Sequence, residues 1–268
     1  MSACVSAVQH IRRLRGGSQS QLLRASDGGH YVCKLSNNPQ HIRVLANEML
    51  ATRLGHLLGL PMPHVQAIEV SAWLVEHSAD LRIDLAGSSI PCKPGRHFGS
   101  LYVQDPASGP VLDYLPEELL NHVTNIDDFP RVIVLDKWTC NADGRQAVFT
   151  RRRRGNYSAT FIDQGYCFNA GEWSFPDSPL RGVYARNHVY RTVTGWDAFE
   201  PALTRAEQLS VDDIRRIADA VPPEWYEFDT DGLHRLVEAL GCRRSIIRDL
   251  ITQFRTSTRN PFPLWTSP

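Results

Sequence analysis

The sequence lacks an excess of charge of either sign. Lys and Arg together number 29, and Asp and Glu also number 29, in a chain of 268 residues. A chain without net charge has no overall field that draws it to nucleic acid or to an acidic membrane surface. We therefore expect neither a membrane nor a nucleic acid as a partner, and any contact with a polyanion has to be local.

The cysteines and histidines lack the spacings of a metal site. The six cysteines contain no CxxC pair and no finger-like spacing, and we interpret them as reduced thiols. They are Cys4, Cys33, Cys92, Cys140, Cys167 and Cys242. The ten histidines show no HxxxH or HxxE arrangement, so the sequence does not predict a zinc site.

Long apolar runs and two enzyme signatures are also absent. No stretch approaches the roughly 18 to 20 apolar residues that a membrane span needs. The beginning of the sequence shows no basic segment followed by an apolar run, so we expect a cytoplasmic protein. No serine lies in a GxSxG elbow, which leaves a hydrolase of that type without support.

The first part of the chain has the pattern of three strands followed by a helix. Short β-like runs occupy residues 8–14, 21–25 and 31–35, and glycine pairs separate them. Pro39 is suited to the first position of a helix, and apolar residues follow at helical spacing as far as Leu58. We predict a β-β-β-α unit with a helix that starts at Asn38-Pro39.

The rest of the chain alternates loops, short strands and, later, helices. Strands are predicted at 65–75, 97–103, 147–150 and 159–162, and helices at 116–123, 127–137 and 231–254. Ser210 and Asp213 form an approximate capping box for a further helix. The last third is predicted to be mainly helical. Between the third and fourth of these strands lie Arg151 to Arg154, which we interpret as a solvated turn or as a contact for an acidic partner.

Two aspartates flank the hairpin predicted at 147–162. Asp143 follows a predicted helix, and Asp163 ends the second strand before Gln164-Gly165. Phosphoryl transfer needs one carboxylate to orient the attacking hydroxyl and another to hold magnesium. We predict the first role for Asp143 and the second for Asp163, whereas two aspartates that only cap turns are the alternative.

Three features that precede these aspartates in the chain come in the order that a kinase presents them. Gly16-Gly17-Ser18 lies between two predicted strands and would let backbone N–H groups approach phosphate oxygens. It is neither a Walker A loop nor GxGxxG, and an ordinary hairpin turn is the alternative interpretation. Lys34 in the third strand would hold the phosphates, and Glu48 in the following helix would pair with it. A solvated lysine and glutamate are the alternatives, and Asn47 is an alternative to Glu48 in the helix register.

The segment from Asp136 to Arg145, which reads DKWTCNADGR, resembles the catalytic segment of HipA-like kinases, which are similar to phosphoinositide lipid kinases. Ile162-Asp163-Gln164-Gly165 stands where that family has its metal-binding aspartate, and the segment 221–225 resembles the family's helical end. The resemblance extends from about Arg13 to Phe254.

The resemblance implies an α+β, two-lobed protein-kinase-like fold in a single domain of residues 1–268. A small β-rich lobe would occupy about 1–105, and a larger, mainly helical lobe about 106–268. ATP with Mg²⁺ would bind between the lobes. A protein serine or threonine is implied as the acceptor, and a small protein partner is an open alternative.

The sequence departs from the family pattern after Asp143. The family has His two residues later and a metal-binding Asn five residues later, where this chain has Arg145 and Val148. Valine cannot bind magnesium, so Asn141 or Gln146 would have to supply the oxygen, although Gln146 could equally begin a strand. We predict an ATP- and Mg²⁺-dependent kinase, with a nucleotide-binding pseudokinase or a small-molecule or lipid kinase as alternatives.

Overall fold

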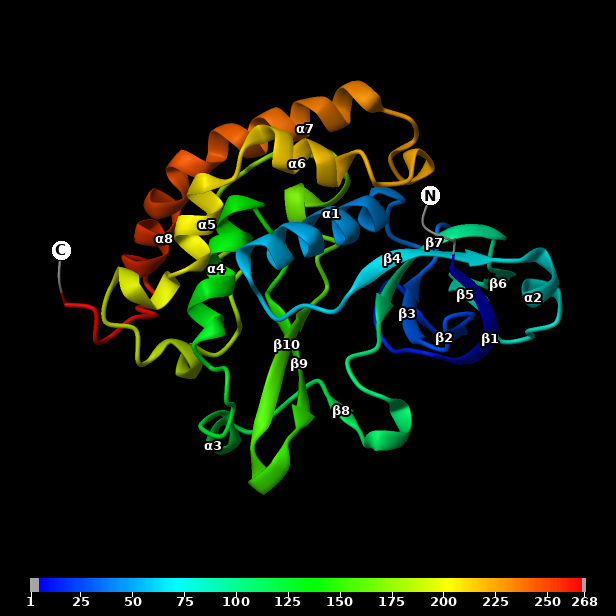
Figure 1. Cartoon of the computed structure of the whole chain (residues 1–268), viewed down its shortest axis with the longest axis horizontal. Coiled ribbons are helices and arrows are strands. Elements are labelled where there is room, and N and C mark those ends of the chain that lie inside the picture. The colour runs from blue at the N-terminus through cyan, green and yellow to red at the C-terminus, as the bar shows by residue number, and fades with distance from the viewer. Residues whose placement is uncertain (1–4, 267–268) are drawn as a thin grey trace.

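Five strands of the N-terminal part close into a barrel (Figure 1). The computed structural model describes residues 5–266. The barrel order is β1 (Val5–Arg13), β2 (Gln21–Ala25), β3 (His30–Lys34), β7 (Gly95–Leu101) and β4 (Val65–Val70). The antiparallel pairing of β1, β2 and β3 confirms the predicted meander. Alternate residues such as Leu23, Tyr31 and Ile68 fill the interior.

A short helix and a hairpin cover one end of the barrel. These are α2 (Ala72–Glu76), β5 (Arg82–Leu85) and β6 (Ser88–Pro91). The strand predicted at 65–75 is therefore too long. It ends at Val70, because the Ser71 side chain accepts a hydrogen bond from the Leu74 N–H at 3.1 Å and so caps α2.

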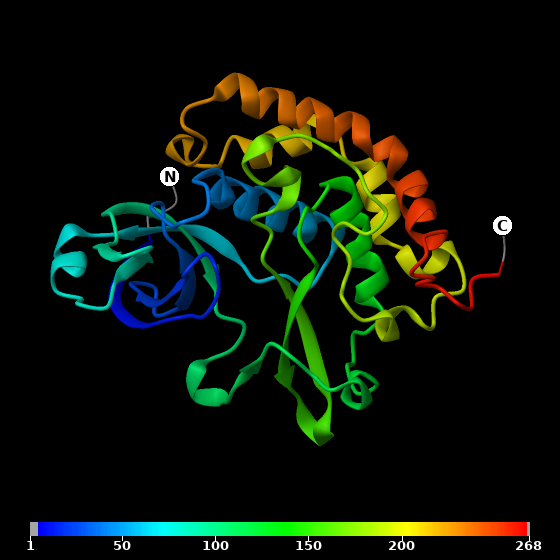
Figure 2. The same ribbon diagram turned by 180° about the vertical axis from the view of Figure 1, so that it is seen from behind.

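Helix α1 (Arg43–Leu58) lies at the centre of the molecule (Figures 1 and 2). It packs against β4 and β7 of the barrel and against helices of the C-terminal part. The predicted helix start at Asn38-Pro39 is wrong. The Asn38 amide instead closes a turn, donating to Leu35 O at 2.8 Å and accepting from Gln40 N at 2.9 Å.

A second sheet begins beyond the barrel, where β8 (Val111–Leu112) pairs with β9 (Gln146–Arg151), and β9 with β10 (Tyr157–Ile162). The β9–β10 hairpin confirms the predicted strand pair, and α4 (Asp128–Trp138) confirms the predicted helix before it. The helix predicted at 116–123 shrinks to α3 (Glu117–Leu120). Beyond α3, Thr124 N donates to Tyr157 O at 2.9 Å and thus joins the chain to β10.

The C-terminal helices form an outer layer over α1 and α4 (Figures 1 and 2). They are α5 (Ala202–Gln208), α6 (Val211–Ala218), α7 (Thr230–Arg243) and α8 (Ile247–Arg255). The capping box of Ser210 and Asp213 is confirmed. The single helix predicted at 231–254 is wrong, because a 3-10 turn separates α7 from α8. In that turn the Ser245 hydroxyl donates to Cys242 O, so a side chain takes up a carbonyl of the helix end.

The described part of the chain carries free thiols at Cys33, Cys92, Cys140, Cys167 and Cys242. Cys4 lies outside the described residues. Among the helices of residues 5–266, none combines the length and the apolar character needed to cross a membrane.

Candidate active site

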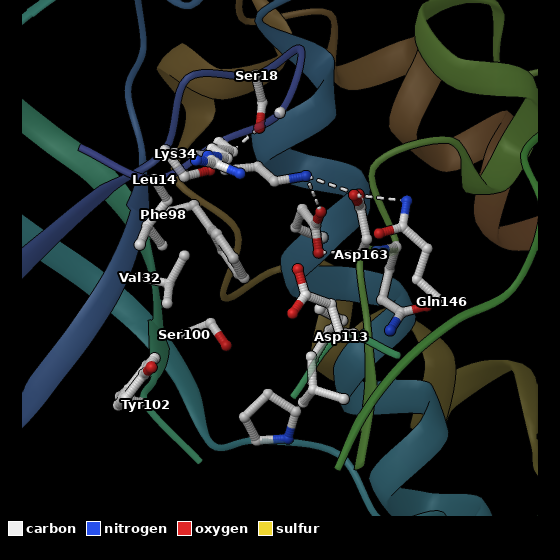
Figure 3. A pocket seen from close by; sticks show the side chains of 18 of the residues that line it. Leu14, Ser18, Val32, Lys34, Phe98, Ser100, Tyr102, Asp113, Gln146 and Asp163 are labelled. Atoms are coloured by element: carbon white, nitrogen blue, oxygen red, sulfur yellow. Dashed lines mark hydrogen bonds and ion pairs between the residues drawn. The ribbon is translucent and has the colours of Figure 1, made fainter. Parts of the chain in front are cut away.

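A cleft of about 610 Å³ lies between the barrel and the β9–β10 hairpin (Figure 3). One wall consists of the β1–β2 turn, β3 and β7, and the other contains the beginning of β9 and the segment after β10. Most of the residues that the sequence singled out line it, namely Gly16, Gly17, Ser18, Lys34, Glu48, Asp143 and Asp163. Residues far apart in the sequence thus meet in one place, as Lys34 and Asp163 do, which are 129 residues apart.

Lys34 links the barrel, helix α1 and the end of the hairpin. It closes β3, and its ammonium forms an ion pair with Glu48 of α1. The Lys34 Nζ also donates to Asp163 Oδ1 at 2.7 Å (Figure 3). Both Lys34 and Glu48 are buried, so neither is the solvated residue of the alternative interpretation. Asn47 points elsewhere, because its amide binds Gly165 O and Ala170 O.

The three charges keep Lys34 and Asp163 ionised. Burial alone would lower the pKa of the Lys34 ammonium, but Glu48 and Asp163 outweigh it and hold that pKa above its ordinary value. Burial opposes ionisation of Asp163, but Lys34 outweighs it and holds the pKa of this carboxyl below its ordinary value. Burial raises the pKa of Glu48 in spite of Lys34. An ionised Asp163 at the cleft wall is suited to binding a cation.

The backbone at Asp163 is held in an unusual conformation. Asp163 has a φ of 63°, in the left-handed region that few non-glycine residues adopt. The next N–H, that of Gln164, donates to Glu48 Oε2 at 2.9 Å. A Cβ at Gly165 would lie 2.6 Å from Val44 Cγ1, so only glycine allows α1 to approach this closely. Helix α1 therefore fixes where the Asp163 carboxylate lies.

Asp143 lies in an exposed loop between α4 and β9. Its Oδ1 accepts from Gly144 N at 2.7 Å, and its own N–H donates to Asn141 Oδ1 at 3.1 Å. The other end of the Asn141 amide donates to Asp136 Oδ1 at 2.9 Å. Asn141 is buried and is not among the residues that line the cleft. In this arrangement Asn141 positions the Asp143 loop, and its oxygen is directed at the backbone.

A buried ion pair that the sequence reading missed connects the two aspartate segments. Arg145 pairs with Asp136, and its guanidinium also donates to Ile162 O at 2.9 Å and to Gln164 Oε1 at 2.7 Å. Burial would lower the pKa of Arg145, but Asp136 more than compensates. The signal in the sequence was Arg145 itself, which stands where the similar family has His.

Gln146 begins β9 and also faces the cleft. Its Nε2 donates to Asp163 Oδ2 at 3.1 Å (Figure 3). Val148, two residues later on the same strand, lines the cleft as well. Asp113, which follows β8, adds a carboxylate that nothing in the sequence had indicated. The oxygens of Asp163 and Gln146 are hard donors of the kind that Mg²⁺ and Mn²⁺ prefer.

The Gly16 to Ser18 turn forms the rim of the cleft on the barrel side. Gly16 has a φ of 128°, a value that favours glycine, and Gln19 N donates back to Gly16 O at 3.1 Å. Arg12 and Arg15 lie on the same rim. Exposed backbone and positive charge together make this rim suitable for phosphate groups.

Comparison with known families decides the identity. The model of a family described as HipA-like kinase matches residues 7–251. The chain belongs to the HipA-like kinase family. This HipA-like chain has no significant match among curated proteins.

Solved kinases share the fold of this HipA-like chain. The proinflammatory kinase CtkA of Helicobacter pylori is 14% identical with a TM-score of 0.57, and the match covers 93% of this chain and 97% of that one. The Golgi casein kinase with Mn/ADP bound is 12% identical with a TM-score of 0.53, over 96% of this chain and 74% of that one. Hydra Fam20 with sugar is 14% identical with a TM-score of 0.52, over 97% and 87%. The fold is therefore a mixed α/β kinase-like fold, and family and fold together support a kinase-type phosphotransferase.

Proposed function

We propose that the chain transfers the γ-phosphoryl group of ATP to a serine or threonine hydroxyl of a protein and uses Mg²⁺. The observation that carries the proposal is the Lys34–Glu48–Asp163 group in the cleft, which unites strand, helix and hairpin as phosphoryl transfer requires. The Mn/ADP named for the Golgi casein kinase supports nucleotide and metal use by analogy of fold.

The proposed mechanism assigns a task to each side chain. The Lys34 ammonium, kept charged by Glu48, binds the α and β phosphates, and the Gly16 to Ser18 turn covers them. Asp163 would hold the cation, which neutralises phosphate charge when it is bound. Asp143, exposed on its loop, orients the acceptor hydroxyl and accepts its proton as the new O–P bond forms and ADP leaves.

We place the boundary between a β-rich and a mainly helical lobe at about residue 105.

Substitution of the two aspartates tests the proposal. With γ-labelled ATP, Mg²⁺ and a host lysate, we expect the unchanged protein to transfer label and both Asp143→Ala and Asp163→Ala to lose it. Asp143→Ala should still bind ATP with Mg²⁺, whereas Asp163→Ala should lose the part of nucleotide affinity that depends on the metal. Asp80→Ala, an exposed aspartate outside the cleft, is the matched control. Near-normal transfer by Asp143→Ala would contradict its assignment.

A nucleotide-binding pseudokinase is the second candidate, and Val148 favours it. This residue faces the cleft where the family has a metal-binding Asn. A rise in melting temperature with ATP, without any label transfer, would favour this candidate.

A further inference from the structure

One face of β9 carries both Val148, which stands where the family has its metal-binding Asn, and Gln146, which has an oxygen that could take the place of that Asn. Side chains two residues apart on a strand point to the same side. Gln146 and Val148 are such a pair, and both line the cleft, whereas no other residue of β9 does so. The side chain of Val148 has no oxygen. Gln146 is thus the only residue of β9 that brings a side-chain oxygen to the cleft.

Gln146 is also held beside the predicted cation ligand. It pairs across the hairpin with Ile162, the residue before Asp163. Its amide Nε2 lies 3.1 Å from Asp163 Oδ2, while the other carboxylate oxygen, Oδ1, binds Lys34. The two ends of a glutamine amide exchange places when the group turns by half a rotation. The amide that donates to an anionic carboxylate in the free protein can therefore present Oε1 to a cation at the same place.

Other oxygen donors near the cleft are less suitable. Both ends of the Asn141 amide are bonded within the Asp143 loop. Asp143 is turned toward Gly144 N. Asp113 is exposed, and within residues 5–266 no hydrogen bond or ion pair joins it to Asp163. Gln164 also lines the cleft, but its amide oxygen accepts from Arg145. Gln146 is the cleft residue whose side-chain amide is bonded to the Asp163 carboxylate.

Few protein ligands are needed at such a site. Mg²⁺ usually takes one or two protein oxygens and completes its shell with phosphate oxygens and water. In agreement with this, the described residues contain no cluster of three His, Cys, Asp or Glu side chains that could hold a metal alone. A carboxylate and an amide fit a cation that arrives with a nucleotide.

We propose that Gln146 is the second protein ligand of the divalent cation, in the role that the family gives to the Asn replaced here by Val148. This inference rests on the proposed ATP-dependent function. Gln146 lies on the same face of β9 as Val148 but two residues earlier. Its side chain is longer than that of Asn, so its oxygen can reach the cation from that position.

The test measures Mn²⁺ binding by electron paramagnetic resonance in the presence of saturating ADP. Gln146→Leu, which keeps similar bulk without an oxygen, should weaken Mn²⁺ binding by about tenfold or more. Its ADP affinity in EDTA should equal that of the unchanged protein. Gln146→Glu should retain Mn²⁺ binding, because it keeps an oxygen at the same reach. Gln253→Leu, at an exposed glutamine of α8, is the matched control and should change nothing.

A rescue variant removes any ambiguity about folding. In Gln146→Leu combined with Val148→Asn, the family's ligand returns, and we expect Mn²⁺ affinity to recover most of the loss. The inference would be overturned if Gln146→Leu kept the Mn²⁺ affinity of the unchanged protein. It would also be overturned if Asp113→Asn, rather than Gln146→Leu, lost Mn²⁺ affinity. In either case Mn²⁺–ADP binding by the unchanged protein would leave the proposed function standing. An unchanged protein that binds ADP with no Mn²⁺ would overturn both.

Discussion

Lys34 is a buried cation whose charge depends on two carboxylates from distant parts of the chain. Removal of one partner from a buried ion pair leaves an uncompensated charge, which is costly in a medium of low polarity. Of the two carboxylates, Glu48 would carry more of this cost, because its burial already raises its pKa. Glu48 is therefore one side chain through which the stability of the protein is linked to pH.

Lys34→Met should lower the free energy of unfolding by about 3 kcal/mol at neutral pH. In this variant Glu48 has a folded-state pKa above its unfolded value, so protonation favours the folded state. The variant therefore gains stability as pH falls and loses it as pH rises through the folded-state pKa. Urea unfolding at about pH 5 and about pH 8 should show a smaller gap to the unchanged protein at the lower pH.

The double variant Lys34→Met/Glu48→Gln controls for this effect. Without an ionisable group at position 48, its stability gap should vary much less with pH than that of Lys34→Met. An equal gap at both pH values in Lys34→Met would contradict the role of Glu48.

Asn47 shows how helix α1 controls the segment that follows Asp163. Its amide donates to Gly165 O at 2.9 Å and to Ala170 O at 2.7 Å, and it accepts from Trp173 Nε1 at 2.8 Å. This segment contains several residues with positive φ, which persist only when neighbours hold them. Glu48 and Asn47 are adjacent in α1, so one turn of helix sets both the Lys34 pair and the backbone beyond Asp163.

Asn47→Ala should destabilise the protein by about 2 kcal/mol, because two backbone carbonyls and an indole N–H lose their partner. We also expect faster hydrogen exchange at residues 165–173, with little change in β2 and β3 of the barrel. Mass spectrometry of exchanged peptides would measure both. Exchange that rises equally across all elements would indicate global destabilisation and refute the local role.

Some of the helices and strands, but not all of the contacts between residues, could be predicted from the sequence. Glycine punctuation and alternation predicted the β1–β3 meander and the β9–β10 hairpin, because such signals are local. The helix start at Asn38-Pro39 failed because the Asn38 side chain bonded to the nearby backbone instead. The roles of Arg145 and Asn47 could not be predicted, since each bonds to residues brought near only by the fold.

The whole molecule places the cleft between two bodies of packed side chains. The barrel encloses one apolar cluster, and a larger cluster extends through α1, α4 and the C-terminal helices. Residues of the β1–β2 turn and of the hairpin line opposite walls of the cleft. A ligand that bridges the walls would therefore join the two bodies.

ATP with Mg²⁺ should slow hydrogen exchange on both walls at once, in the β1–β2 turn and at the beginning of β9. The distal helix α8 should show little local change, because it lies away from the cleft (Figure 1). At a ligand concentration of about 100 times Kd, the protein should also gain about 2.7 kcal/mol of stability. Protection confined to the barrel would contradict a site shared by both walls.

Helix α1 has a consequence for how the chain assembles. It is encoded before residue 60, among the barrel strands, yet Leu45, Met49 and Leu54 belong to the cluster that the C-terminal helices complete. In a nascent chain that has emerged only as far as the barrel, β4 and β7 contact α1, but the C-terminal helices that cover the rest of its apolar surface are still missing. Cooperative folding must wait for α4 to α6, and a gene split after β7 would yield two halves that need each other.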